Sequence, residues 1–157
     1  MKTELIKQYR RGWRVFERLV QDFDADAWLH TGRKTITPVR LSFHILQSVK
    51  LHIEDSTDIF FPSGRSFECS WETAKEEDLP TQNDVLACIH ELKARTEEWL
   101  AEIDFNAEIK LFPWAGETKL AVALFLLHHS LYHLGELSSL LNESRNGEVE
   151  DNYVKAL

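Results

Sequence analysis

The stretch from Leu120 to Leu141 reads LAVALFLLHHSLYHLGELSSLL; it is the most apolar segment of the chain and contains three of its seven histidines. Apolar residues recur in it at spacings of four and three, which is typical of a helix packed against its neighbours. One seam consists of Leu120, Leu124, Leu127, Leu131, Leu134, Ser138 and Leu141, and a second of Val122, Leu126, His129, His133, Glu136 and Leu140. A helix that is apolar over so wide an arc needs cover on most sides, so we predict the central helix of a bundle.

The middle of the second seam is polar, because His129, His133 and Glu136 occupy positions that face the core. His129 and His133 are four residues apart, so both imidazoles can converge on one point, as metal ligands do. His128 is five residues before His133 and about 140° away around the axis, which places it off both seams. Two interpretations remain open: a metal site, or core histidines that hydrogen-bond to a neighbouring helix, because a pair alone lacks the other ligands of a zinc site.

Length and composition are those of a single domain that covers residues 1–157. With 43% hydrophobic and 28% charged residues, the chain can bury a core without disulfides. The net charge of −8 argues against nucleic acid and anionic membrane surfaces as partners. The apolar run 120–127 is too short to span a bilayer, and the N-terminus lacks the apolar segment of a signal peptide. We therefore expect a cytoplasmic protein.

The two cysteines, Cys69 and Cys88, do not form a CxxC motif. One disulfide is possible by count, but a helical domain of this size does not need it, so we expect free thiols in a reducing compartment. Cys88 falls within a helical pattern and should be buried and inert, whereas Cys69 falls in a loop.

Three more amphipathic helices are predicted before the apolar stretch. The four expected helices cover residues 3–22, 38–60, 81–103 and 118–142. Thr37 is a suitable N-cap for the second helix, and Pro38 suits its first position. Thr81 and Asp84 resemble a capping box at the start of the third helix, and Thr118 can cap the fourth. The chain is therefore predicted to be an all-α four-helix bundle.

The connection 61–80 is unusually long for neighbours in a simple bundle. A connection of this length can cross over and make the second and third helices parallel, in up-down-down-up order. The second and fourth helices then become antiparallel, which brings His44, in the second turn of its helix, level with His133. His52 lies about 80° from His44 around the axis and Tyr132 beside His133, and both are weaker candidates for the site. The apolar loop 104–117 is expected to pack over one end of the bundle.

Two short motifs resemble those of the DinB-like superfamily of bacterial metalloproteins. One is TPVRLSFHI at residues 37–45, which contains His44, and the other is HSLYHLGE at residues 129–136, which contains His129 and His133. The similarity extends over the whole chain in helix order and length. Most such sequences have Gln where this chain has Glu136.

The resemblance implies an up-down-down-up bundle in which His44, His129 and His133 hold a divalent ion, zinc or nickel, in a homodimer. Related proteins include metal-dependent transferases that act with low-molecular-weight thiols such as bacillithiol, mycothiol or glutathione. Three neutral imidazoles leave a metal its charge and open coordination positions, so a thiol transferase or a hydrolase is the expected function. The alternative is a non-catalytic stress-response or structural module. Glu136 is the candidate catalytic residue, as a proton acceptor or as a partner that orients an imidazole.

Overall fold

The computed structural model describes residues 1–64, 72–147 and 150–155, and within these ranges it contains helices and no strand. The four long helices are α1 (Lys2–Asp22), α3 (Pro38–Glu54), α4 (Gln82–Glu102) and α5 (Lys119–Ser144). The shorter ones are α2 (Ala25–His30), the 3₁₀ helix η1 (Glu76–Asp78) and α6 (Asn152–Lys155). The prediction of an all-α chain is confirmed.

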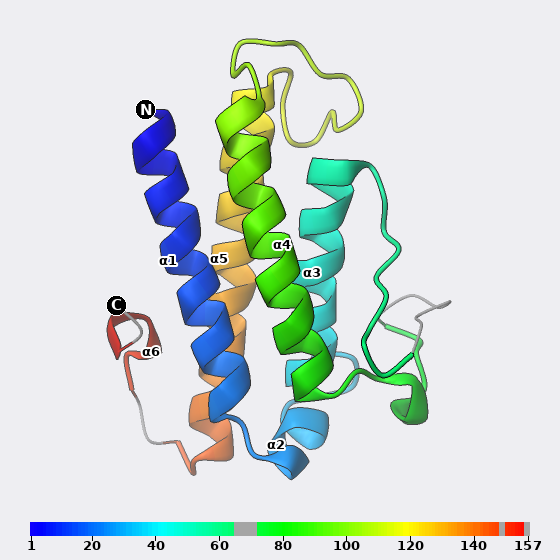
Figure 1. Ribbon diagram of the computed structural model, residues 1–157. Coiled ribbons are helices and arrows are strands. Elements are labelled where there is room, and N and C mark those ends of the chain that lie inside the picture. Colours follow the sequence, from blue (N-terminus) through cyan, green and yellow to red (C-terminus); the bar gives the residue numbers. More distant parts are fainter. Residues whose placement is uncertain (65–71, 148–149, 156–157) are drawn as a thin grey trace.

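The long helices lie side by side in a ring, in which α4 packs against α1 and α3, and α5 packs against the same two helices. Figure 1 shows that α3 and α4 run in one direction while α1 and α5 run in the other. The end of α3 and the start of α4 therefore lie at opposite ends of the molecule. This arrangement is compatible with the predicted four-helix bundle and its crossover.

The apolar seams of the four helices supply most of the core, which contains Phe16, Phe43, Ile89 and Leu126 among its most deeply buried side chains. Tyr9 in α1 donates a hydrogen bond of 2.6 Å to the backbone oxygen of Ala123 in α5. A buried phenol needs such a partner, so this bond also fixes the two helices relative to each other.

Helix α5 is less covered than its sequence predicted. Leu124, expected in a core seam, is 40% exposed, because α5 has long-helix neighbours only on its α1 and α3 sides. By length and composition α5 could also cross a membrane, and a core helix of a soluble protein has the same composition. Its apolar face toward α1 and α3 is buried, as in a core helix.

The helix ends follow local sequence chemistry. The Thr81 hydroxyl accepts the Asp84 N–H at 3.1 Å while the Asp84 carboxylate accepts the Thr81 N–H at 3.0 Å, so the predicted capping box is present. Thr118 Oγ1 accepts the Ala121 N–H at 3.2 Å, as a cap should. Thr37 occupies the N-cap position with Pro38 after it, but its hydroxyl makes no capping bond.

Helix α3 ends at Glu54, earlier than the predicted Phe60. Asp55 adopts the left-handed conformation with φ of 54° and donates its N–H to the Leu51 oxygen at 3.0 Å. The segment that follows, DSTD at residues 55–58, is rich in side chains that compete for backbone hydrogen bonds. This local competition stops the helix although no proline or glycine lies between Glu54 and Pro62.

The segment between α1 and α3 contains the short helix α2, where no helix was predicted. Asp24 caps it by accepting the Ala27 N–H at 2.8 Å, a local signal that hydrophobic periodicity does not reveal. Trp28 is 3% exposed and donates its indole N–H to the Pro80 oxygen at 3.3 Å. Trp28 therefore anchors this segment to the start of α4.

The loop 104–117 covers the end of the ring at which α5 begins. Phe112 and Ala115 are buried with Val122, and Leu51 and Trp99 pack against them from α3 and α4. This cluster confirms the predicted packing of the loop over one end.

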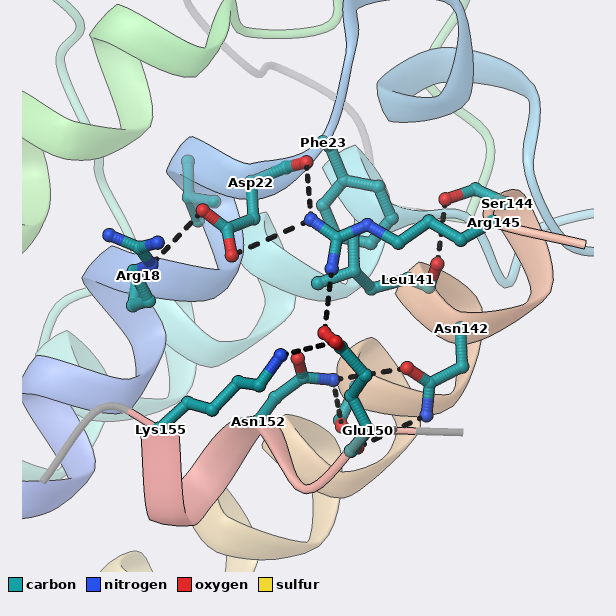
Figure 2. A network of polar contacts seen from close by, with 12 residues as sticks. Arg18, Asp22, Phe23, Leu141, Asn142, Ser144, Arg145, Glu150, Asn152 and Lys155 are labelled. Carbon is teal, nitrogen blue, oxygen red and sulfur yellow. Dashed lines mark hydrogen bonds and ion pairs between the residues drawn. The ribbon is translucent and has the colours of Figure 1, made fainter. Parts of the chain in front are cut away.

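The tail returns to the opposite end of α5, where a polar network holds α6 in place (Figure 2). Asn152 donates to Ser138 Oγ at 2.8 Å, and Arg145 pairs with Glu150 at 3.3 Å and with Asp22 of α1 at 3.6 Å. These contacts connect the tail, α5 and α1.

Cys88 is a free, buried thiol, as predicted. Burial is the main reason that its pKa rises to about 11, with Glu91 and Asp84 adding to the effect, so it is protonated and unreactive at neutral pH. Cys69 lies outside the described residues.

Candidate metal centre

Three histidines from two helices meet at one place. His44 lies in the second turn of α3, while His129 and His133 lie on successive turns of α5. One nitrogen of each imidazole lies within 4.8 Å of the others, and the ring centroids are 5.1, 4.7 and 4.5 Å apart. All three side chains are half-buried. We call this group the three-histidine site; it could hold a metal ion, and it contains the residues that the sequence predicted.

The two imidazoles of α5 face each other through their Nε2 atoms, which are 3.2 Å apart. Two lone pairs at this distance repel unless a proton or a cation lies between them. A tetrahedral zinc ion with Zn–N bonds of about 2.0–2.1 Å separates its ligand nitrogens by about 3.3–3.4 Å. The observed spacing therefore fits a pair of ligands of one ion.

Glu136 acts on this site through His133. Its Oε2 lies 2.7 Å from His133 Nδ1, so a neutral His133 carries its proton on Nδ1 and keeps the Nε2 lone pair toward His129. A carboxylate in this position orients the ring and makes it a stronger ligand. Of the two roles predicted for Glu136, the geometry supports the orienting one.

Ser48 holds the other imidazole, and sequence reasoning gave it no role. Its hydroxyl lies 3.2 Å from His129 Nδ1 across the α3–α5 contact. Ser48 is 9% exposed, so few other partners are available to it. The signal in the sequence was its position four residues after His44, on the same face of α3.

Two of the three imidazoles are kept neutral by their surroundings. Burial lowers the pKa of His44 to about 4, and the nearby His133 and His129 act in the same direction. Burial likewise lowers the pKa of His129 to about 4, with His133 and His52 adding to the effect. Both imidazoles are thus uncharged at pH 7, the state in which they can bind a metal.

Other candidate residues lie apart from the three nitrogens. His128 is exposed and is not part of the group, as its position on the helix predicted. Tyr132 is 66% exposed, although its ring lies 5.1 Å from that of His133. His52 is buried one turn beyond Ser48, against aromatic rings. His30 and His90 are exposed and lie near carboxylates.

No family model matches this chain, and neither a curated protein nor a solved structure matches it.

Proposed function

We propose that the protein is a four-helix-bundle metalloprotein of the DinB-like superfamily, with up-down-down-up topology and a zinc or nickel ion bound by His44, His129 and His133. Its proposed activity is a transferase reaction with a low-molecular-weight thiol, or a hydrolysis. The parallel direction of α3 and α4 supports this topology, since it is the direction that a crossover produces.

The observation that carries the proposal is the convergence of three half-buried imidazoles, two of which are kept neutral by burial. Such a donor set suits zinc and nickel better than magnesium or calcium, which prefer oxygen ligands. A divalent ion held by three neutral ligands supplies Lewis-acid chemistry that lowers the pKa of a bound thiol or water.

The residues around the imidazoles have separate tasks. Glu136 orients His133 through Nδ1, and Ser48 restrains His129 through its Nδ1, so both rings present Nε2 to the same point. Burial of His44 opposes its protonation and thereby keeps a ligand available near neutral pH. Preorganised rings of this kind raise metal affinity, because little side-chain freedom is lost on binding.

A non-catalytic module is the second candidate function. His44 belongs to α3 and the other two ligands to α5, so a bound ion would connect two helices and stabilise the fold without any turnover. A homodimer and a low-molecular-weight thiol as partner are proposed on the basis of the resemblance to the DinB-like superfamily.

The test is metal analysis of protein purified without added metal, followed by calorimetric titration with zinc and nickel. His44→Ala, His129→Ala and His133→Ala should each lose stoichiometric binding, whereas His128→Ala, the adjacent exposed histidine, should retain it. Circular dichroism of each variant separates ligand loss from unfolding. Retention of one metal per chain by folded His129→Ala would refute the site.

Turnover distinguishes the two functions. The metal-loaded protein is assayed with glutathione, bacillithiol and mycothiol against a generic electrophile, and with ester substrates for hydrolysis. Metal-dependent consumption of one thiol or ester, lost in His44→Ala, would establish an enzyme. Full metal binding and metal-dependent stabilisation without any turnover would favour the module.

A further inference from the structure

The outward side of α5 lacks the charges that cover the other helices. Residues 120–135 contain no Asp, Glu, Lys or Arg, although the chain has 26 acidic and 18 basic residues. The next charged residue, Glu136, is bonded to His133. The exposed charged residues on the outward sides of α1 and α4 are, in contrast, Lys7, Arg11, Arg14, Arg18, Glu91, Arg95, Glu98 and Glu102. Because charged groups are depleted where one protein surface packs on another, this side of α5 has the composition of an interface.

Apolar side chains project from this uncharged side. Leu124 is 40% exposed and Tyr132 is 66% exposed, and the exposed His128 lies between them at spacings of four residues. The long helices that pack against α5 within the described chain are α1 and α3, and they leave this row open to solvent. We use the name α5 outer face for Ala121, Leu124, Phe125, His128, Leu131, Tyr132 and Gly135.

The α5 outer face is symmetric in size about His128. The residues four positions away in either direction are large and exposed, those three away are half-buried and apolar, and those seven away are small. These pairs are Leu124 and Tyr132, Phe125 and Leu131, and Ala121 and Gly135. In a two-fold symmetric contact between antiparallel copies of one helix, a residue before the axis meets the residue equally far after it. The face is therefore complementary to itself.

Gly135 has no use within a single chain. It lies in the middle of α5 without a positive φ, and glycine at such a position destabilises a helix. A Cβ atom at Gly135 would have no other side chain or element of the described residues within 4 Å. The distance between two packed helices depends on the side chains at their contact, so a glycine on an outward face permits a second helix to come close.

We propose that the α5 outer face binds a second copy of this chain, with the two α5 helices antiparallel about a two-fold axis at His128. Leu124 then packs against Tyr132 of the partner subunit, and Ala121 against Gly135 of the partner subunit. Two copies with a net charge of −8 repel each other, but this contact buries no charged side chain of the face. The inference deepens the proposed function and rests on it, because it assigns an interface to the proposed homodimer.

The size of the face sets the strength of the dimer. From Ala121 to Gly135 it is about 21 Å long, and one helix face is smaller than the ~800 Å² per partner of a standard interface. We therefore expect a dissociation constant in the micromolar range. At submicromolar concentration the chains are separate, and Leu124 then contributes little to the stability of each one.

The proposed interface borders the three-histidine site. The Phe125 ring stacks on His129 with centroids 5.7 Å apart, and the Tyr132 ring lies 5.1 Å from that of His133. The partner subunit is thus placed beside the site, while all three ligands come from one chain.

Sedimentation equilibrium with a chelator present tests the dimer between about 1 and 200 µM, a range that covers a micromolar dissociation constant. The mass of the wild type should rise from 18.3 kDa toward twice that value. Leu124→Glu brings an unpaired charge into the contact and should weaken association at least about 10-fold. Ile36→Glu, at a position outside the face that is 44% exposed, should not. A wild-type mass that stays at 18.3 kDa, or unchanged association of Leu124→Glu, would overturn the proposal.

Gly135→Leu separates close packing from general stickiness. It adds an apolar side chain where a single chain has room, so each chain should fold as before, but it holds the two helices apart and should weaken association at least about 10-fold. Ala94→Leu adds the same side chain to an exposed position of α4 and should leave association unchanged. Tighter association of Gly135→Leu would contradict the proposed packing. Circular dichroism of each variant checks that it is folded.

Disulfide crosslinking tests the position of the axis, in a Cys69→Ser background because Cys88 is buried. His128→Cys brings two thiols together at the axis, so a mild oxidant should join two chains. Gly135→Cys is equally exposed, but its two copies lie about 21 Å apart along the helices and should not be joined. Gly135→Cys should instead form a disulfide with Ala121→Cys when the two variants are mixed. Equal crosslinking of His128→Cys and Gly135→Cys alone would refute the register.

The remaining outcomes distinguish this inference from the proposed function. Flotation of the wild type with neutral phosphatidylcholine vesicles, lost in Leu124→Glu, would mean that a lipid surface covers the face and would overturn the proposal. A dimer that Leu124→Glu leaves intact would refute the α5 outer face but not the homodimer. Zinc content is measured in parallel: its absence from the wild type would refute the metal site and leave the interface standing.

Discussion

Acid should destabilise the metal-free protein in a pH window set by the buried histidines. The pKa values of His44 and His129 are lowered to about 4 in the folded chain, against about 6.5 for a histidine in an unfolded chain. As the pH falls from 6.5 toward 4, the unfolded chain takes up protons at these positions while the folded chain does not. The free energy of unfolding must therefore decrease as the pH falls through this window.

The size of the effect follows from the two shifts. At pH 5 each group alone would contribute about 2 kcal/mol of lost stability, since one pKa unit corresponds to about 1.36 kcal/mol. Partial exposure and the mutual influence of the two rings reduce the sum, so we expect a loss of about 2 kcal/mol between pH 7 and pH 5. Carboxylates affect stability only at lower pH. Burial alone would raise the pKa of Asp84, but hydrogen bonds from Thr81 and Ser63 lower it, so the stabilisation by this carboxylate is lost only below about pH 4.

The assay is urea unfolding followed by far-ultraviolet circular dichroism at pH 7, 6 and 5 with a chelator present. A loss of about 2 kcal/mol corresponds to a midpoint lower by about 1 M urea. His44→Gln removes one of the two groups and should reduce this loss, while His128→Gln, on the exposed side of α5, should not. An unfolding free energy that stays constant or rises from pH 7 to pH 5 would show that the folded chain does not hold His44 and His129 neutral, as would an unaltered pH dependence in His44→Gln.

Three further results are expected. Zinc at about 100 times its dissociation constant should stabilise the wild type by about 2.7 kcal/mol, measured as a rise in melting temperature of several degrees. This rise should be absent in His44→Ala and present in His128→Ala. Glu136→Gln preserves an acceptor for His133 Nδ1 and should retain the metal, whereas Glu136→Leu should weaken the metal affinity about 10- to 100-fold in a chelator competition. If turnover in metal-loaded Glu136→Gln falls by about 10², Glu136 has a proton-transfer role instead. On α5, Leu126→Ala at a fully buried position should cost about 2–5 kcal/mol in urea unfolding, and Leu124→Ala, 40% exposed, less than about 1 kcal/mol; equal costs would mean that a partner covers Leu124.

Periodicity and capping chemistry determined the helices, because both are local. The Thr81–Asp84 capping box and the start of α5 after Thr118 lie where the sequence predicted them. The separation of His129 from His128 also follows from the helical repeat alone, since neighbouring residues point about 100° apart. Local hydrogen bonding decided two places that periodicity did not predict: the polar segment after Glu54 ended α3 early, and Asp24 initiated α2 between the first two predicted helices.

Contacts between helices were decided only by the tertiary structure. That Glu136 bonds His133 Nδ1 depends on side-chain directions, and that Ser48 reaches His129 depends also on the offset between α3 and α5. A helical pattern fixes the face on which a residue lies, but it does not state which atom of a neighbouring helix will meet that face. For this reason the sequence alone predicted which three imidazoles converge, while the orientation of those imidazoles required the packed chain.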